Sequence, residues 1–263
     1  MIRNIKIANF KSIASQSIPL GRFTVLIGEN GAGKSNILEA LVMASAASTG
    51  RLEREILIGR GMRLTYSQTL PLGTRGEGLT ELLINMRERE PNKLDVINEG
   101  LALLGFFEKV YFDSLSSKKI YVKDRYIQRD GALLDQMSTN EGFLFCLFYL
   151  TLFTSSDTPA AFAIENIENG LNPKLVEALV KKLKELGAKY GKQAIISTHS
   201  PAILDALNLD DEENDVLLAV DRNLDGHTRI TRVKKPRNST GKITRLSELF
   251  LRGLLGGVPK NFV

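Results

Sequence analysis

The stretch that most constrains this chain is the sequence Gly-Glu-Asn-Gly-Ala-Gly-Lys-Ser at positions 28–35. It lies between an apolar run at 23–27 and a helix-like segment at 36–46. The pattern G-x-x-x-x-G-K-[ST] between a strand and a helix predicts a phosphate-binding loop. Its backbone N–H groups can surround a polyphosphate, and the helix N-terminus adds positive potential. Lys34 would reach the β- and γ-phosphates, and the Ser35 hydroxyl would bind Mg²⁺. The residues expected to contact a nucleotide here are Asn30, Gly31, Ala32, Gly33, Lys34, Ser35 and Asn36.

Size and composition indicate a soluble globular protein. The chain has 263 residues, 43% hydrophobic and 25% charged, which suffices for one large α/β domain with a small insertion. Cys146 is the only cysteine, so no disulfide can form within the chain, and a buried thiol is expected. The first residues lack the apolar core of a signal peptide, and the longest apolar run, 143–153, is too short to cross a bilayer. We expect a cytoplasmic protein without membrane contact.

Alternating strand and helix patterns in the second half of the chain predict a largely parallel α/β sheet. Buried strands are expected at 160–164 and 193–197, and a terminal strand pair at 215–220 and 228–233. The expected helices are 142–153, 173–186 with Gly187 at its end, 201–207, and a last helix at 246–252 with Ser247 as its cap.

The middle section, about 50–135, has weaker patterns. It contains a predicted short helix at 79–89, stopped by Pro91, and candidate strands at 111–112, 120–122 and 125–127. We therefore expect one domain over 1–263 with an inserted β and helical subdomain at about 50–135.

Two polar segments follow buried strands of the predicted sheet. Glu165 ends one strand, and His199 follows the next. A carboxylate at such a strand end can bind Mg²⁺ opposite Ser35, directly or through water. A simpler reading gives Glu168 and Asn172 only a helix-capping role, and lets His199 satisfy a helix N-terminus.

Together these motifs resemble the ABC-type ATPases of the RecF, SMC and OLD group, which are AAA family ATPases of DNA repair or anti-phage defence. The resemblance rests on Asn-Phe-Lys-Ser at 9–12, the phosphate loop, the segment 165–173, and Thr-His-Ser-Pro at 198–201. It implies an ABC-ATPase head with a P-loop NTPase fold, and ATP and Mg²⁺ as cofactors. The start at 9–12 disfavours a transporter subunit.

The resemblance assigns roles to individual residues. It implies Ser35 and Glu165 as metal ligands, and Glu165, Asn166, Glu168 and His199 as the catalytic set, with His199 near the γ-phosphate. It also implies nucleotide contacts from Lys11 and Ser12. The signature loop, which completes the site of a second subunit, best matches Asn140, Glu141 and Gly142, with a competing register on Ser138.

One departure from the family concerns the position after Glu165. The family usually has a glutamate there to polarise the attacking water, whereas this chain has Asn166. An amide can orient water through its oxygen but cannot act as a carboxylate base at pH 7. Glu168 could substitute if the loop bends. We therefore expect slow ATP hydrolysis.

The resemblance implies an ATPase whose nucleotide state controls two-fold dimerisation and the engagement of DNA or an effector protein. The chain shows no nuclease motif, so a nuclease or toxin would be a separate partner. The alternative is a slow or non-hydrolysing ATP sensor that holds and releases such an effector.

The end of the chain is basic. From His227 onward it contains nine Lys or Arg residues and one acid, within a net charge of +5 for the whole chain. This segment predicts nucleic-acid contact through phosphates, although a solvated basic face is the commoner explanation of a charge run. The residues expected to lead such contact are Arg232, Lys234, Lys235 and Arg237.

Overall fold

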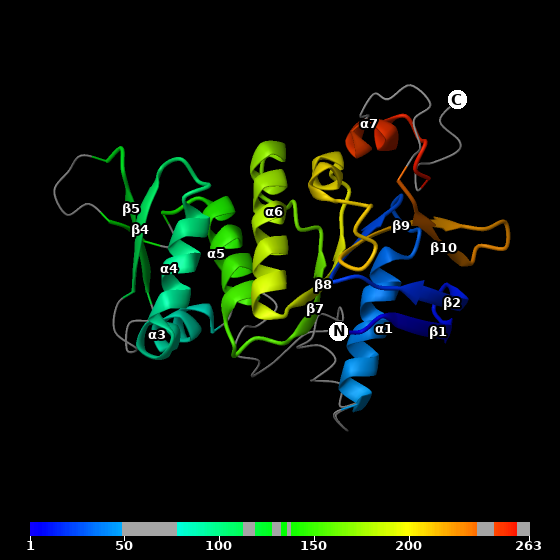
Figure 1. Cartoon of the computed structure of the whole chain (residues 1–263), viewed down its shortest axis with the longest axis horizontal. Coiled ribbons are helices and arrows are strands. Elements are labelled where there is room, and N and C mark those ends of the chain that lie inside the picture. Colours follow the sequence, from blue (N-terminus) through cyan, green and yellow to red (C-terminus); the bar gives the residue numbers. More distant parts are fainter. Residues whose placement is uncertain (49–77, 113–118, 128–132, 136–137, 236–244, 257–263) are drawn as a thin grey trace. The chain divides into compact units, whose positions relative to one another are not determined.

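The computed structural model describes residues 1–48, 78–112, 119–127, 133–135, 138–235 and 245–256. The chain forms two compact units: Met1–Leu52 together with Ala160–Val263, and Glu53–Pro159. Most of their helices and strands are labelled in Figure 1. Each unit is described by itself.

The first unit is organised around a five-stranded sheet with the order β10-β9-β3-β8-β7. The strands are β3 (Phe23–Ile27), β7 (Ala161–Glu165), β8 (Gln193–Ser197), β9 (Asp215–Arg222) and β10 (Thr228–Val233). All neighbours pair in parallel except β10, which is antiparallel to β9. Every residue of β3 and β8 is buried, as in strands covered on both faces. The predicted α/β fold with a largely parallel sheet is confirmed.

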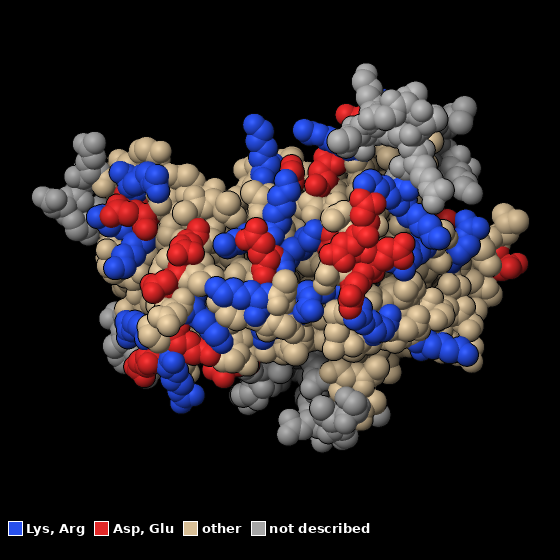
Figure 2. All heavy atoms as spheres, viewed as in Figure 1, with Lys and Arg blue, Asp and Glu red and all other residues tan. Residues whose placement is uncertain are grey.

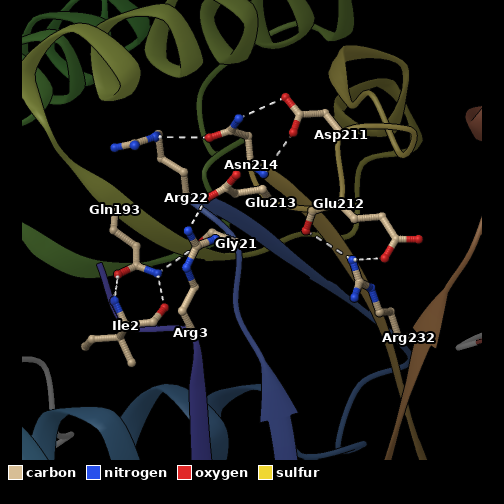
Figure 3. A network of polar contacts seen from close by, with 10 residues as sticks. All are labelled: Ile2, Arg3, Gly21, Arg22, Gln193, Asp211, Glu212, Glu213, Asn214 and Arg232. Atoms are coloured by element: carbon tan, nitrogen blue, oxygen red, sulfur yellow. Dashed lines mark hydrogen bonds and ion pairs between the residues drawn. The ribbon is translucent and has the colours of Figure 1, made fainter.

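An antiparallel hairpin precedes the sheet strands. It consists of β1 (Asn4–Phe10), where the partial alternation of Ile5 and Ile7 with polar residues is typical of a strand, and β2 (Ile13–Pro19), which was not predicted. Apolar residues of the hairpin and of α1 (Lys34–Ser48) form one core with sheet residues such as Leu26 and Leu218. The buried Gln193 amide ties the start of the chain to this core, because it donates to the carbonyls of Ile2 and Gly21 and accepts from the Ile2 N–H (Figure 3).

The later helices of this unit are α6 (Pro173–Tyr190), the 3₁₀ helix η1 (Pro201–Ala206) and α7 (Leu246–Leu251). The expected end of α6 at Gly187 was wrong: the helix continues to Tyr190 and closes at Gly191, whose φ of 68° fits a glycine cap. Ser247 was wrongly expected to cap α7. Its hydroxyl and N–H instead donate to the Asp205 carboxylate on η1.

The second unit contains α3 (Leu79–Arg89), α4 (Pro91–Leu101), α5 (Glu141–Thr154) and a three-stranded antiparallel sheet of β4 (Phe107–Phe112), β5 (Ile120–Asp124) and β6 (Leu134–Asp135). Pro91 ends α3 as expected but also begins α4, which was not predicted. Residues 125–127 were wrongly expected to be a strand. Cys146 is buried within α5, and burial raises the pKa of its thiol to about 12.

Candidate nucleotide site

The phosphate loop connects β3 to α1, and its glycines allow a close approach to the neighbouring hairpin β9–β10. A Cβ on Gly28 would lie 2.2 Å from the Val220 carbonyl oxygen. A Cβ on Gly33, whose φ is 111°, would lie 2.2 Å from the Thr228 hydroxyl oxygen. Side chains at these positions would push the loop off its support, so the loop requires glycine at both.

The Lys34 ammonium lies inside the loop. Its Nζ donates to the carbonyl oxygens of Gly28 at 2.8 Å and Glu29 at 3.0 Å. Burial lowers the pKa of Lys34, and the nearby carboxylates of Glu165, Glu168 and Glu29 oppose that shift. A cation that is buried against carbonyl groups can be satisfied better by phosphate oxygens.

Ser35 and Glu165 meet across the sheet, although 130 positions separate them. The Ser35 hydroxyl, in the first turn of α1, donates to the Glu165 carboxylate at the end of β7. Parallel pairing causes this meeting, because Glu165 pairs with Ser197 on β8, which in turn pairs with Leu26 on β3. A hydroxyl and a carboxylate at one point are the hard oxygen ligands that Mg²⁺ prefers, so this pair fits the predicted metal.

Asn166 turns the chain sharply at the end of β7. Its φ is 52°, a left-handed conformation that Asn adopts more easily than most residues. Its N–H donates to the Ser197 carbonyl oxygen at 3.0 Å. The backbone of Asn166 is thus held against β8.

Glu168 joins the two polar segments. Its carboxylate accepts from the Thr198 hydroxyl at 2.8 Å and from the His199 N–H at 2.7 Å. The α6 N-terminus is capped instead by Asn172, whose side-chain oxygen accepts from Leu175 N–H at 3.0 Å. Of the two capping roles considered above, only that of Asn172 is therefore observed.

His199 is a solvent-exposed residue, and one side of its imidazole is desolvated by its neighbours. Burial lowers its pKa, and the Lys34 charge lowers it further, while Glu168 and Glu165 act in the opposite direction. His199 is therefore mainly neutral at pH 7 and can either donate or accept a hydrogen bond.

Lys11 and Ser12 lie in the turn between β1 and β2. Lys11 forms an ion pair with Glu39 on α1. The Ser12 hydroxyl is 2.6 Å from both the Asn36 amide nitrogen and the Thr228 hydroxyl. These contacts hold the turn against the first turns of α1.

The profile of the family described as AAA ATPase domain matches residues 1–146, which is more than half of the chain. The chain belongs to the AAA ATPase domain family. A second AAA-domain profile, whose description names the AbiEii toxin of type IV toxin–antitoxin systems, matches residues 135–205. Together with the relatives below, these matches identify an ABC-type ATPase of the RecF/SMC-like group.

Curated relatives match short segments. The DNA replication and repair protein RecF of Brucella abortus (strain 2308) is 49% identical over 45 residues, 17% of this chain and 12% of RecF. An uncharacterized protein of Methanocaldococcus jannaschii is 40% identical over 67 residues, 23% of this chain and 31% of that protein. The chain thus matches only about an eighth to a third of these relatives.

Solved structures share the fold over most of the chain. An SMC head bound to the C-winged helix domain of ScpA has a TM-score of 0.57 at 14% identity, covering 88% of this chain and 97% of the other. The SMC head domain from Thermotoga maritima has a TM-score of 0.54 at 16% identity, covering 89% of this chain and 100% of the other. The predicted ABC-ATPase head fold is confirmed. Within the described residues, no helix is long and apolar enough to cross a membrane.

The predicted signature loop of this AAA ATPase domain lies in the second unit, where α5 begins. Asn140 caps the helix, because its side-chain oxygen accepts from the Phe143 N–H at 2.9 Å. Glu141 and Gly142 form the first turn. The competing residue Ser138 precedes the helix, and its N–H donates to the Asp135 side chain at 2.8 Å.

Two residues that contact the phosphate loop were not predicted from the sequence. Arg222 Nε donates to the Gly31 carbonyl oxygen at 2.9 Å, and the Thr228 hydroxyl donates to the Ala32 carbonyl oxygen at 3.0 Å. They lie 191 and 196 positions from their partners. A hydrogen bond to a backbone carbonyl leaves no pattern in the sequence, so only the strand pairing could have located them.

The basic segment at the end of the chain is partly neutralised. Arg232 donates to the Glu212 carbonyl at 3.1 Å and forms an ion pair with its carboxylate at 3.3 Å (Figure 3). Lys235 forms an ion pair with Asp210, while Lys234 is exposed. Figure 2 likewise shows acidic side chains directly beside basic ones on the face in view. Arg237 lies outside the described residues.

Proposed function

We propose that this AAA ATPase domain binds and slowly hydrolyses ATP with Mg²⁺, and that its nucleotide state controls self-association and the engagement of an effector. The observation that carries the proposal is the convergence of Lys34, Ser35 and Glu165 at the carboxyl ends of the parallel strands β3 and β7, which lie on either side of β8. An open α/β sheet binds its ligands at this edge.

The roles of the three residues follow from their chemistry. Lys34 exchanges the carbonyl oxygens of Gly28 and Glu29 for phosphate oxygens. Ser35 and Glu165 would hold Mg²⁺, which would supply positive charge to offset the charge of the phosphates. His199, mainly neutral at pH 7, would donate a hydrogen bond to the γ-phosphate.

Slow hydrolysis is proposed because the position that follows the metal ligand carries an amide. Asn166 can orient a water molecule but cannot take its proton. Glu168 has a carboxylate, but both of its oxygens already accept hydrogen bonds from the segment 198–199. Glu168 is therefore a weaker candidate for the base than its charge alone suggests.

Self-association is proposed because the phosphate loop by itself surrounds only part of a triphosphate. The segment 140–142 of a second copy would complete the γ-phosphate side, giving a two-fold dimer. The chain 1–263 would then be a single ATPase domain with an inserted subdomain at about 50–135, and we place the protein in the cytoplasm.

We favour an effector protein over DNA as the main partner. Arg232 and Lys235 form ion pairs with carboxylates of the same chain, which partly neutralise their charge. The phosphate contacts expected of the basic segment are weaker as a result. A matched family whose description names a toxin–antitoxin system, and an SMC head bound to ScpA, both agree with a protein partner. A nuclease or toxin in DNA repair or anti-phage defence fits this proposal.

A second function, a non-hydrolysing ATP sensor that holds an effector, is favoured by Asn166. The two functions share the binding site and differ in turnover. The release of ADP and phosphate by the purified chain with ATP and Mg²⁺, measured with and without DNA, separates them: an ATPase forms these products and a non-hydrolysing sensor does not.

The test of the nucleotide site is Lys34→Ala. We expect tight ATP binding to be lost in calorimetry, because the cation at the β- and γ-phosphates is removed. The melting temperature without ATP should not fall, since burial makes this cation costly in the empty protein. Lys181→Ala, which removes an exposed lysine on α6, is the matched control. Equal ATP affinity in the two variants would refute the site.

A further inference from the structure

The hairpin β9–β10 supports the phosphate loop at successive points along the loop. The Val220 carbonyl faces Gly28 so closely that a Cβ there would lie 2.2 Å away. Further along, Arg222 donates to the Gly31 carbonyl oxygen, and Thr228 donates to the Ala32 carbonyl oxygen. The hairpin therefore fixes two consecutive carbonyl groups of the loop.

The directions of these hydrogen bonds can be worked out. A Thr hydroxyl has one proton, and Thr228 gives it to Ala32, so the Ser12 hydroxyl must donate to Thr228 across their 2.6 Å contact. The Asn36 amide then donates to Ser12 at 2.6 Å. The Thr228 N–H also donates to the Ser12 carbonyl at 2.7 Å. Every hydroxyl in this chain of hydrogen bonds is satisfied, and Thr228 is 1% exposed.

Holding a carbonyl group also orients the next N–H group. In a trans peptide unit the C=O and the following N–H point in opposite directions. Fixing the Gly31 carbonyl on Arg222 therefore aims the Ala32 N–H away from the hairpin, where it donates to the Glu29 carbonyl oxygen at a long 3.3 Å. Fixing the Ala32 carbonyl on Thr228 aims the Gly33 N–H away from the hairpin in the same way. N–H groups of a phosphate loop that point away from its support are the groups that surround an anion.

We propose that Arg222 and Thr228 are positioning residues for polyphosphate binding, which act by orienting the N–H groups of Ala32 and Gly33. This inference rests on the proposed nucleotide site. It also gives Ser12 and Asn36 a supporting role through Thr228, in place of a direct contact with the nucleotide.

The first test compares two substitutions of Thr228. Thr228→Val keeps the shape but removes the hydroxyl and leaves the Ala32 carbonyl unsatisfied, whereas Thr228→Ser keeps the hydroxyl. We expect ATP affinity in calorimetry to fall about tenfold in the Val variant and to stay within about twofold of wild type in the Ser variant. Thr231→Val, an exposed position on the same strand, is the matched control.

The second test addresses Arg222, which is exposed at the end of β9 and can be replaced without loss of the core. Arg222→Met removes the donor to Gly31, and Arg222→Lys keeps the charge without the paired donors to Gly31 and Gly226. A positioning role predicts that both variants bind ATP several-fold more weakly. In ¹⁵N spectra of the nucleotide-free protein, the Ala32 and Gly33 amide signals should shift in these variants and in Thr228→Val.

The outcomes are distinguishable. If wild type does not bind ATP, the proposed function fails. If wild type binds ATP and Thr228→Val and Arg222→Met bind it equally well, only the positioning role is overturned. Full affinity in Arg222→Lys with loss in Arg222→Met would overturn positioning by Arg222 in favour of a simple charge effect. If Thr228→Val does not fold, Arg222→Met decides the inference.

Discussion

At the residue scale, Asn166 combines an unusual identity with an unusual backbone. In the proposed register it stands where the family usually has a glutamate, and its φ of 52° is one that Asn tolerates better than most residues. The left-handed backbone conformation at this position therefore favours Asn, whereas activation of the attacking water would favour Glu. A restored glutamate would strain the backbone modestly and add a base.

We expect Asn166→Glu to accelerate single-turnover ATP hydrolysis, because general-base help contributes about 10²–10⁴-fold in rate. Quenched-flow measurement of bound ATP converted to ADP tests this. Asn166→Gln has the same length without the charge and should give no acceleration. If Asn166→Glu changes nothing and Glu168→Gln abolishes a brisk activity, Glu168 is the working base.

His199 allows a prediction about pH. Since burial and Lys34 lower its pKa, the unfolded chain binds this proton more readily than the folded protein does. The contribution of His199 to stability is therefore fully present above the ordinary value of 6.5 and is lost as the pH falls below it. An NMR titration should give a pKa below 6.5 for the signal that disappears in His199→Gln. A value at or above 6.5 would contradict the described environment.

The residues of the site differ in how far they could be predicted. Lys34 and Ser35 belong to a local motif that has one structural solution, and Glu165 was located because parallel strands end at one edge. Arg222 and Thr228 could not be located, because they contact carbonyl groups and their place depends on the hairpin register. The position of Asn140 relative to the phosphate loop stays a prediction.

At the element scale, α6, η1 and β9 are joined by an ion pair between the partly buried Lys184 and the buried Asp215. Lys184 on α6 donates to the Asp215 carboxylate on β9 and, at 2.7 Å, to the Ala206 carbonyl. Asp215 is 2% exposed, and its second oxygen has no hydrogen-bond partner among the described residues. The carboxylate therefore depends on Lys184 for its charge balance.

We expect Lys184→Met to reduce the free energy of unfolding by about 3–5 kcal/mol, because it leaves a buried carboxylate unpaired. Chemical denaturation measures this change. Lys184→Met combined with Asp215→Asn should recover part of the loss, since it removes the unpaired charge. Lys182→Met, whose side chain lies on α6 near Glu185 on the surface, should change stability by less than about 1 kcal/mol.

The ends of helices and strands could be predicted only in part from local sequence patterns. The strand 193–197 was predicted with its observed ends, because the apolar residues 194–196 stand between a turn at Gly191 and a polar segment that begins at Thr198. The end of α6 was misjudged at Gly187, because a single glycine inside a helix is tolerated, and the exposed residues Ala188 and Lys189 that follow it carry no apolar pattern that would mark the last turn. The strand β2 was missed because Ser15, Gln16 and Ser17 are polar, and its two buried residues, Ile13 and Ile18, stand five positions apart and so give no alternating pattern.

At the scale of the whole molecule, the proposed ATP-dependent dimer can be tested by mass. With a non-hydrolysable ATP analogue and Mg²⁺, sedimentation should show a mass twice that of the nucleotide-free chain, because each site lacks the 140–142 segment of a second copy. The mass of the Lys34→Ala variant should not change when the analogue and Mg²⁺ are added, because this variant does not bind ATP tightly. An unchanged wild-type mass over a wide concentration range would count against the dimer.

The pairing of β3 has a consequence for synthesis on the ribosome. β3 ends at Ile27, but its hydrogen-bonding neighbours are β8, which begins at Gln193, and β9, which begins at Asp215. At about 5–20 residues per second, these partners emerge roughly 10 seconds or more after β3. During that interval an apolar strand with two unpaired edges is available to chaperones or to other nascent chains. The nucleotide site is thus encoded early in the chain and completed only late in its translation.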